Sequence, residues 1–74
     1  NGYFNFDNET IGSIMKQISR WYDVDVEYKD ADQTRLYWVA NYPRSGNLKG
    51  LLKSIELTGG AHFKIEGRKI LVTR

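Results

Sequence analysis

The chain of 74 residues contains no cysteine, one histidine and one proline. Without cysteine it can form no disulfide and no thiolate metal site, and a zinc site would have to be built from carboxylates around His62 alone. No segment approaches the roughly 18 consecutive apolar residues of a membrane-spanning helix, and nothing at the start resembles a signal peptide. We therefore expect one small domain, residues 1–74. At this size only about 60% of the unfolded surface is buried, so every apolar position matters to the core.

The formal net charge is only +2, but the charges are unevenly placed. Residues 1–34 carry three basic and seven acidic side chains, whereas residues 35–74 carry eight basic and two acidic ones. Two interpretations are open. The two halves could attract each other within the fold, or they could form a bipolar surface that orients a partner.

The sequence nearly repeats itself at an offset of 37 residues. In each half, apolar residues at helical spacing precede a segment in which apolar and polar residues alternate. The helical positions correspond pairwise as Ile11 and Leu48, Ile14 and Leu51, Met15 and Leu52, and Ile18 and Ile55. The strand positions correspond as Val24 and Ala61, Val26 and Phe63, and Tyr28 and Ile65. The pattern indicates two copies of one small α/β unit.

The order of elements predicts an α+β fold, βαβ followed by βαββ. Strands are expected at residues 3–6, 24–28, 35–41, 61–66 and 69–73, with a tight hairpin at residues 66–68. Asp7 and Asn8 are suitable N-cap residues for the first helix, which should end at Asp23. Asn47 should cap the second helix, and residues 58–60 should terminate it because glycine accepts a left-handed conformation.

The strand at residues 35–41 is apolar on both faces, and its orientation decides which side chains a partner can reach. Trp38 is assigned to the core together with Leu36 and Ala40. The opposite face would then be exposed and, with Leu71 and the loop after the strand, would form an apolar patch surrounded by cations. The alternative is that these are scattered exposed apolar residues. The predicted protein-binding residues are Arg35, Tyr37, Val39, Tyr42, Arg44 and Leu71.

The chain lacks the residue patterns of common active sites. His62 lies on the polar face of a strand, and no other side chain is a conventional base near neutral pH. The aspartates at residues 23–32 lack the glycine turn and distant glutamate of a calcium loop, and no glycine pair opens a phosphate-binding helix. An RNA-binding α/β module remains an alternative, although only Arg35, Tyr37 and Tyr42 match its third strand. We expect neither an enzyme nor a bound cofactor or metal.

Several segments together resemble one known family. They are Phe-Asp-Asn at 6–8, Ile-Ser-Arg-Trp-Tyr-Asp-Val-Asp-Val at 18–26, the strand end 38–42 with Pro-Arg after it, the helix 48–57 with Thr-Gly after it, and Phe-Lys-Ile-Glu-Gly-Arg-Lys-Ile at 63–70. This set resembles the C-terminal domain of FecR-type anti-sigma regulators, especially those of the Bacteroidetes branch. The resemblance covers almost the whole chain.

The resemblance implies a fold in which two helices lie side by side between two small sheets, shared with the secretin and TonB N-terminal (STN) domains of TonB-dependent transducers. It also implies a periplasmic signalling domain at the C-terminal end of a single-pass inner-membrane protein, so that the chain is a fragment of a longer regulator. Such regulators control an extracytoplasmic-function sigma factor. Their periplasmic part receives its signal from the N-terminal domain of an outer-membrane transducer.

The sequence thus predicts a protein-binding domain whose partner is the N-terminal signalling domain of a TonB-dependent transducer, with strand addition as a plausible mode. We expect no nucleic-acid partner, contact with the membrane only through an upstream segment, and a monomer or weak dimer. Two alternatives are kept, namely the STN domain of a transducer itself and the RNA-binding module.

Overall fold

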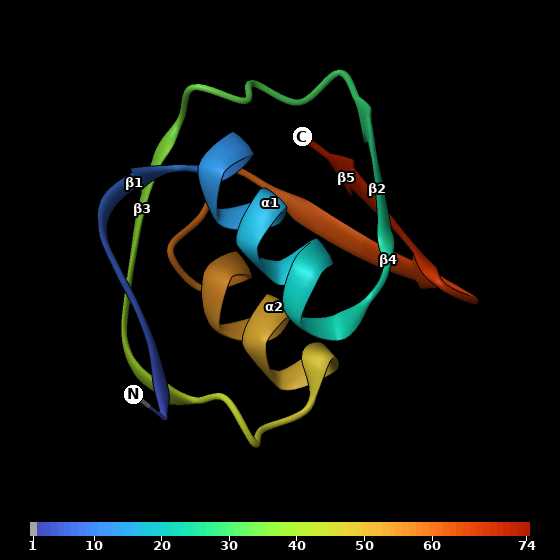
Figure 1. Cartoon of the computed structure of the whole chain (residues 1–74). Helices are drawn as coiled ribbons and strands as arrows, with labels where there is room; N and C mark the ends of the chain where they lie inside the picture. The colour runs from blue at the N-terminus through green and yellow to red at the C-terminus, as the bar shows by residue number, and fades with distance from the viewer. Residues whose placement is uncertain (1) are drawn as a thin grey trace.

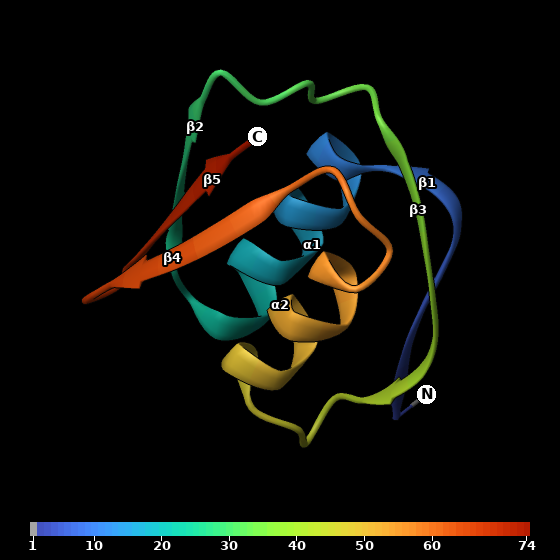
Figure 2. The ribbon, with the colours of Figure 1, turned by 180° about the vertical axis from the view of Figure 1, so that it is seen from behind.

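The computed structural model describes residues 2–74, so that Asn1, the first residue of the predicted domain, lies outside the described part. The elements follow the order β1 (Tyr3–Thr10), α1 (Ile11–Tyr22), β2 (Asp25–Lys29), β3 (Leu36–Pro43), α2 (Leu48–Glu56), β4 (His62–Glu66) and β5 (Lys69–Thr73). The two helices lie side by side between two small sheets (Figures 1 and 2). The predicted α+β arrangement, βαβ followed by βαββ, is confirmed.

The two sheets combine strands from both halves of the pseudo-repeat. Strands β1 and β3 form an antiparallel pair. The other sheet has the order β2-β5-β4, in which β5 is parallel to β2 and antiparallel to β4. The β4–β5 hairpin turns at Gly67 and Arg68, and Gly67 has a φ of +62° that glycine adopts without strain. The first half therefore contributes one strand to each sheet, whereas the second half contributes β3 to one sheet and both β4 and β5 to the other.

Helix α1 buries the apolar stripe that its spacing predicts, and Ile11, Ile14, Met15 and Ile18 are all buried. The predicted N-cap at Asp7 or Asn8 is wrong. Strand β1 continues through both residues, and Thr10 is the cap, with its hydroxyl accepting a hydrogen bond from the Ser13 amide at 3.2 Å. The helix ends as predicted at Asp23, which has a φ of +56°.

Helix α2, in the second half of the chain, has the same features as α1, namely a side-chain N-cap and a buried apolar stripe. The predicted cap is confirmed, because Asn47 Oδ1 accepts a hydrogen bond from the Gly50 amide at 2.7 Å. Leu51, Leu52 and Ile55 are buried against α1 and the sheets in one continuous core. The positive φ angles of Gly59 and Gly60 then turn the chain away from the helix, as predicted.

The β1–β3 pair contains two β-bulges that the alternation of the sequence does not predict. Phe4 pairs with Tyr42, Phe6 with Val39, and Glu9 with Tyr37, so that β3 and then β1 each contain one extra residue. Asn41 and Asn8 lie in these bulges with φ angles of +56° and +54°, a conformation that asparagine tolerates. The Asn41 amide donates to Asn5 Oδ1 at 2.9 Å, which satisfies a donor that the bulge releases.

The predicted orientation of the 35–41 strand is wrong. Tyr37 and Val39 are 1% and 9% exposed and face the helices, whereas Leu36 and Trp38 are 43% and 55% exposed and face outward. Alternation alone could not decide between the faces, because both are apolar. The bulge at Asn41 shifts the alternation by one residue, so that Tyr42 points to the side of the helices together with Tyr37 and Val39.

Candidate functional site

The six predicted binding residues do not form one surface. Arg35 to Arg44 belong to β3 and the segments next to it, whereas Leu71 lies on β5 in the other sheet, across the two helices (Figure 1). Tyr37 and Val39 belong to the core, and burial raises the pKa of the Tyr37 phenol. An exposed patch that contains Tyr37, Val39 and Leu71 is therefore ruled out by the geometry.

Arg44 holds the loop between β3 and α2. Its guanidinium carbon lies 4.4 Å from the ring centre of Phe4 and 4.9 Å from that of Trp21, within the range of cation–π contacts. Trp21 Nε1 donates a hydrogen bond to the Arg44 carbonyl at 3.0 Å, and the Arg44 amide donates to the Gly2 carbonyl at 2.9 Å. These contacts engage the side chain and the backbone of Arg44 within the domain.

Tyr42 holds the other end of the same loop. Its hydroxyl donates to the Asn47 carbonyl at 2.8 Å, and the Tyr22 hydroxyl donates to the Gly46 carbonyl at 2.8 Å. A Cβ at Gly46 would lie 2.7 Å from the Tyr42 ring, and a Cβ at Gly50 would lie 2.5 Å from the Tyr42 hydroxyl. Tyr42 therefore positions the start of α2, and glycine at both positions makes room for it.

Arg35 and Leu71 remain accessible, but on different sheets. The Arg35 side chain packs along the Gly60 backbone, and the Arg35 carbonyl accepts a hydrogen bond from the Ile11 amide at 2.9 Å. Leu71 is half-buried on the outer face of the three-stranded sheet, between Glu27 of β2 and Lys64 of β4. Lys69 forms ion pairs with Glu27 at 3.1 Å and Glu66 at 3.8 Å on this face.

Opposite charges from the two halves of the chain meet at this sheet. Arg68 pairs with Asp23 and Lys69 pairs with Glu27, and both pairs join the basic second half to the acidic first half. The hydrogen bond and the charge of Glu27 raise the pKa of Lys69. Part of the charge asymmetry in the sequence is therefore neutralised inside the domain. The pairs are exposed, so each contributes little to stability.

The structure exposes a different apolar pair, Leu36 and Trp38, on the outer face of the β1–β3 sheet. Both helices lie on the opposite side of this sheet, and no element of residues 2–74 covers its outer face (Figures 1 and 2). Trp38 lies across from the β1 bulge, because the pairs Phe6–Val39 and Glu9–Tyr37 bracket it. Tryptophan is enriched at protein interfaces and in their energetically dominant positions. We name this pair the Trp38 face.

The described residues offer little for catalysis or metal binding. Within residues 2–74, no group of three or more His, Cys, Asp or Glu side chains could hold a metal ion. His62 is exposed on the outer side of β4. Of the two helices in this part of the chain, neither has the length and apolar character needed to cross a membrane. The accessible features are sheet faces, strand edges and grooves, which suit recognition of another macromolecule.

Comparison with known proteins decides the family. The family described as FecR, C-terminal, matches residues 3–72. The chain belongs to the FecR C-terminal family. A crystal structure at 1.65 Å of a proposed anti-sigma factor from Parabacteroides distasonis has the same fold, with a TM-score of 0.82 over 96% of this chain. Sequence identity to that protein is 17%, so the likeness shows the fold alone. The comparison with curated proteins gave no match.

This FecR C-terminal domain covers 33% of the length of the Parabacteroides protein, about one third. The family membership confirms the predicted resemblance. It identifies the chain as a FecR C-terminal domain and favours that assignment over a transducer's own STN domain.

Proposed function

We propose that this FecR C-terminal domain is a periplasmic, non-enzymatic protein-binding module of a membrane-anchored anti-sigma regulator. Its partner is the N-terminal signalling domain of a TonB-dependent outer-membrane transducer, and the contact controls an extracytoplasmic-function sigma factor. The observation that carries the proposal is the family match over residues 3–72, nearly the whole chain. The absence of a metal-binding cluster among the described residues is compatible with this role.

We propose the Trp38 face as the contact surface. Trp38 and Leu36 are large apolar side chains two residues apart on one strand, and both are exposed. A tryptophan with a polar indole N–H and a large ring can contribute much of the affinity of an interface when a partner desolvates it. Arg35 precedes this strand, but its side chain packs along the Gly60 backbone and is not part of the Trp38 face.

Tryptophan fluorescence can test this function, because the chain has only two tryptophans. In the Trp21→Phe variant the emission reports Trp38 alone. We expect its maximum to shift to the blue, in a saturable manner, when the transducer's N-terminal domain is added and removes water from the indole. The matched Trp38→Phe variant reports Trp21, which packs against Phe4 and Arg44, and should shift much less.

Circular dichroism of both variants establishes that they are folded. A saturable shift of Trp38 alone supports both the partner and the surface. Saturable binding with no change in the Trp38 emission would support the proposed partner but would contradict the Trp38 face as the contact surface. Absence of binding at concentrations above about 100 μM would overturn the partner, because a signalling contact weaker than this would be unusually weak.

A further inference from the structure

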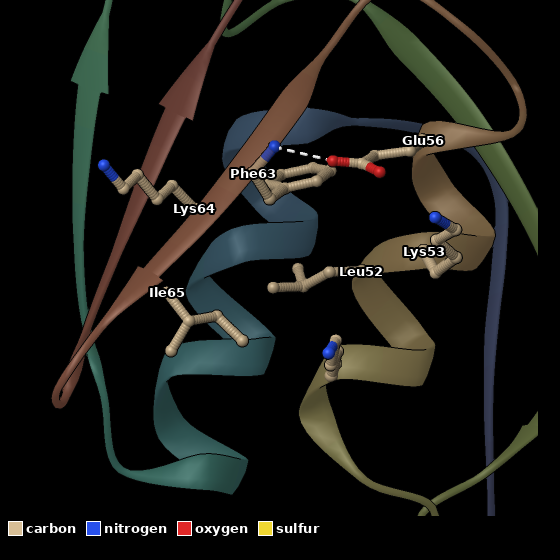
Figure 3. Close-up of a pocket in the computed structure, with 7 residues that line it drawn as sticks. Leu52, Lys53, Glu56, Phe63, Lys64 and Ile65 are labelled. Carbon is tan, nitrogen blue, oxygen red and sulfur yellow. Dashed lines mark hydrogen bonds between the residues drawn. The ribbon is translucent and has the colours of Figure 1, made fainter.

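A groove lies between α2 and β4, and Figure 3 shows side chains that line it. Its volume is about 540 Å³, within the range of about 300–1,000 Å³ that ligand-binding clefts occupy. Its apolar floor consists of Leu52, Phe63 and Ile65. Ile65 is 42% exposed although it lies on the same side of β4 as Phe63, which packs against the core. The apolar floor is therefore only partly covered by the domain itself.

The groove has an excess of positive charge. Lys49 and Lys53 project from α2, and within residues 2–74 neither forms an ion pair. Lys64 also borders the groove, but its side chain points away from α2 and pairs with Glu66 at 3.6 Å (Figure 3). The single carboxylate that borders the groove, Glu56, is already engaged by a backbone amide. A negatively charged occupant could therefore pair with Lys49 and Lys53, because no carboxylate of the described residues forms an ion pair with either lysine.

The edge of β4 that faces the groove can pair with another strand. Strand β4 is an edge of the three-stranded sheet. The Phe63 amide donates to Glu56 Oε2 at 2.9 Å, as Figure 3 shows, so it points away from β5. Because amides alternate in direction along an antiparallel strand, the Ile65 amide points to the same edge, whereas the Lys64 amide points to β5. The groove thus offers the Ile65 amide as a backbone donor as well as an apolar floor.

We propose that this groove binds an extended acidic segment of a partner protein, one in which carboxylate and apolar side chains alternate. The segment adds to the β4 edge and accepts a hydrogen bond from the Ile65 amide. Its apolar side chains face the groove and cover Ile65 and Phe63. Its carboxylates point to the opposite face of the segment and are attracted by the charges of Lys49 and Lys53 at longer range. The contact that Glu56 makes with the Phe63 amide is an intramolecular example of a carboxylate at this edge. The inference does not rest on the proposed transducer partner or on the Trp38 face.

The test uses this chain, labelled with ¹⁵N, and a blocked octapeptide that alternates glutamate and valine. We expect amide chemical shifts to change at residues 52–56 and 62–66, with a dissociation constant below about 1 mM, typical of a short flexible peptide that loses entropy on binding. Hydrogen exchange of the Ile65 amide should slow, and that of the Lys64 amide should not. An octapeptide that alternates lysine and valine is the matched control and should leave the spectrum unchanged.

Charge reversal provides the second arm. The double variant Lys49→Glu, Lys53→Glu should bind the acidic octapeptide at least about tenfold more weakly, because attraction becomes repulsion. The double variant Lys16→Glu, Lys29→Glu carries the same change in net charge on exposed lysines outside the groove and should bind as the unmodified chain does. Urea unfolding midpoints close to that of the unmodified chain establish that both variants are folded.

Several results would overturn the inference. They are equal responses to the two octapeptides, shift changes centred on the Trp38 face, equal weakening by both double variants, or no response at millimolar peptide. Shift changes in the groove that appear with increasing protein concentration alone would assign it to a second copy of this chain and would also overturn it. None of these results bears on binding of the transducer domain, which is measured separately.

Discussion

Tyr37 and Trp38 are consecutive residues that lie on opposite sides of the β1–β3 sheet. Tyr37 is enclosed by the core, while Trp38 faces outward. A buried aromatic ring contributes to stability through the apolar surface that it removes from water, whereas an exposed ring is available to a partner. The two residues should therefore respond to substitution in opposite ways.

We expect Tyr37→Ala to lower the free energy of unfolding by about 3–5 kcal/mol, because a large buried ring is replaced by a cavity. The matched variant Trp38→Ala should change it by less than about 1 kcal/mol, since it removes an exposed side chain. Urea unfolding followed by circular dichroism measures both. A small domain has little stability to lose, so Tyr37→Ala should be largely unfolded at 37 °C. Equal stability of the two variants would contradict the orientation of β3.

Asp32 is the carboxylate whose pH dependence the structure defines best. The hydroxyl and the amide of Thr34 donate to Asp32 Oδ1 at 2.6 and 2.9 Å, and these hydrogen bonds hold its pKa below the ordinary value of 3.8. A lowered folded-state pKa contributes stability at neutral pH that is lost as the pH falls through that pKa. We expect an NMR titration to find this pKa below 3.8, and Thr34→Ala to raise it toward 3.8. An unchanged titration in Thr34→Ala would contradict this assignment.

At the scale of elements, the sequence predicts most of the fold. The apolar spacing of Ile11 to Ile18 and of Leu48 to Ile55 predicts both helices, because only a helix places these positions on one face. The cap at Asn47 and the hairpin at Gly67 are local signals, and both are confirmed. The pairing of distant strands, such as β2 with β5, carries no comparable local signal.

The two bulges limited the prediction of the site. A bulge shifts the alternation of a strand by one residue, and Asn8 and Asn41 resemble ordinary loop or cap residues in the sequence. The wrong cap at Asp7 or Asn8 follows from the unrecognised bulge in β1. The wrong orientation of Tyr37 and Val39 has another cause, because the strand is apolar on both faces. A large aromatic residue such as Trp38 suits an interface as well as a core.

The junction between the β3–α2 loop and helix α2 provides a test at this scale. A Cβ at Gly50 would lie 2.5 Å from the Tyr42 hydroxyl, so Gly50→Ala should destabilise the domain by about 1–3 kcal/mol despite the better helix propensity of alanine. In the Tyr42→Phe background the hydroxyl is absent, and Gly50→Ala should cost less by about 1 kcal/mol or more. Urea unfolding of the four proteins gives this coupling. Additive effects would show that Tyr42 does not restrict position 50.

At the scale of the whole molecule, two helices between two sheets leave both outer sheet faces available. The face of the three-stranded sheet is occupied by ion pairs around Lys69, whereas the face of the β1–β3 sheet exposes Leu36 and Trp38. The repeat predicts this layered arrangement only in part, since it specifies two equal units but not which of their surfaces stay apolar. The proposed contact with the transducer follows from this difference between the two faces.

Calorimetric titration with the N-terminal signalling domain of the proposed transducer partner tests the central claim most directly. It compares the unmodified chain, the double variant Leu36→Ser, Trp38→Ser, and the control Leu57→Ser, which changes an apolar side chain that is 81% exposed after α2. We expect micromolar or tighter binding by the unmodified chain and the control, and at least about 30-fold weaker binding by the double variant. No binding by the unmodified chain, or equal affinity of all three proteins, would contradict the account.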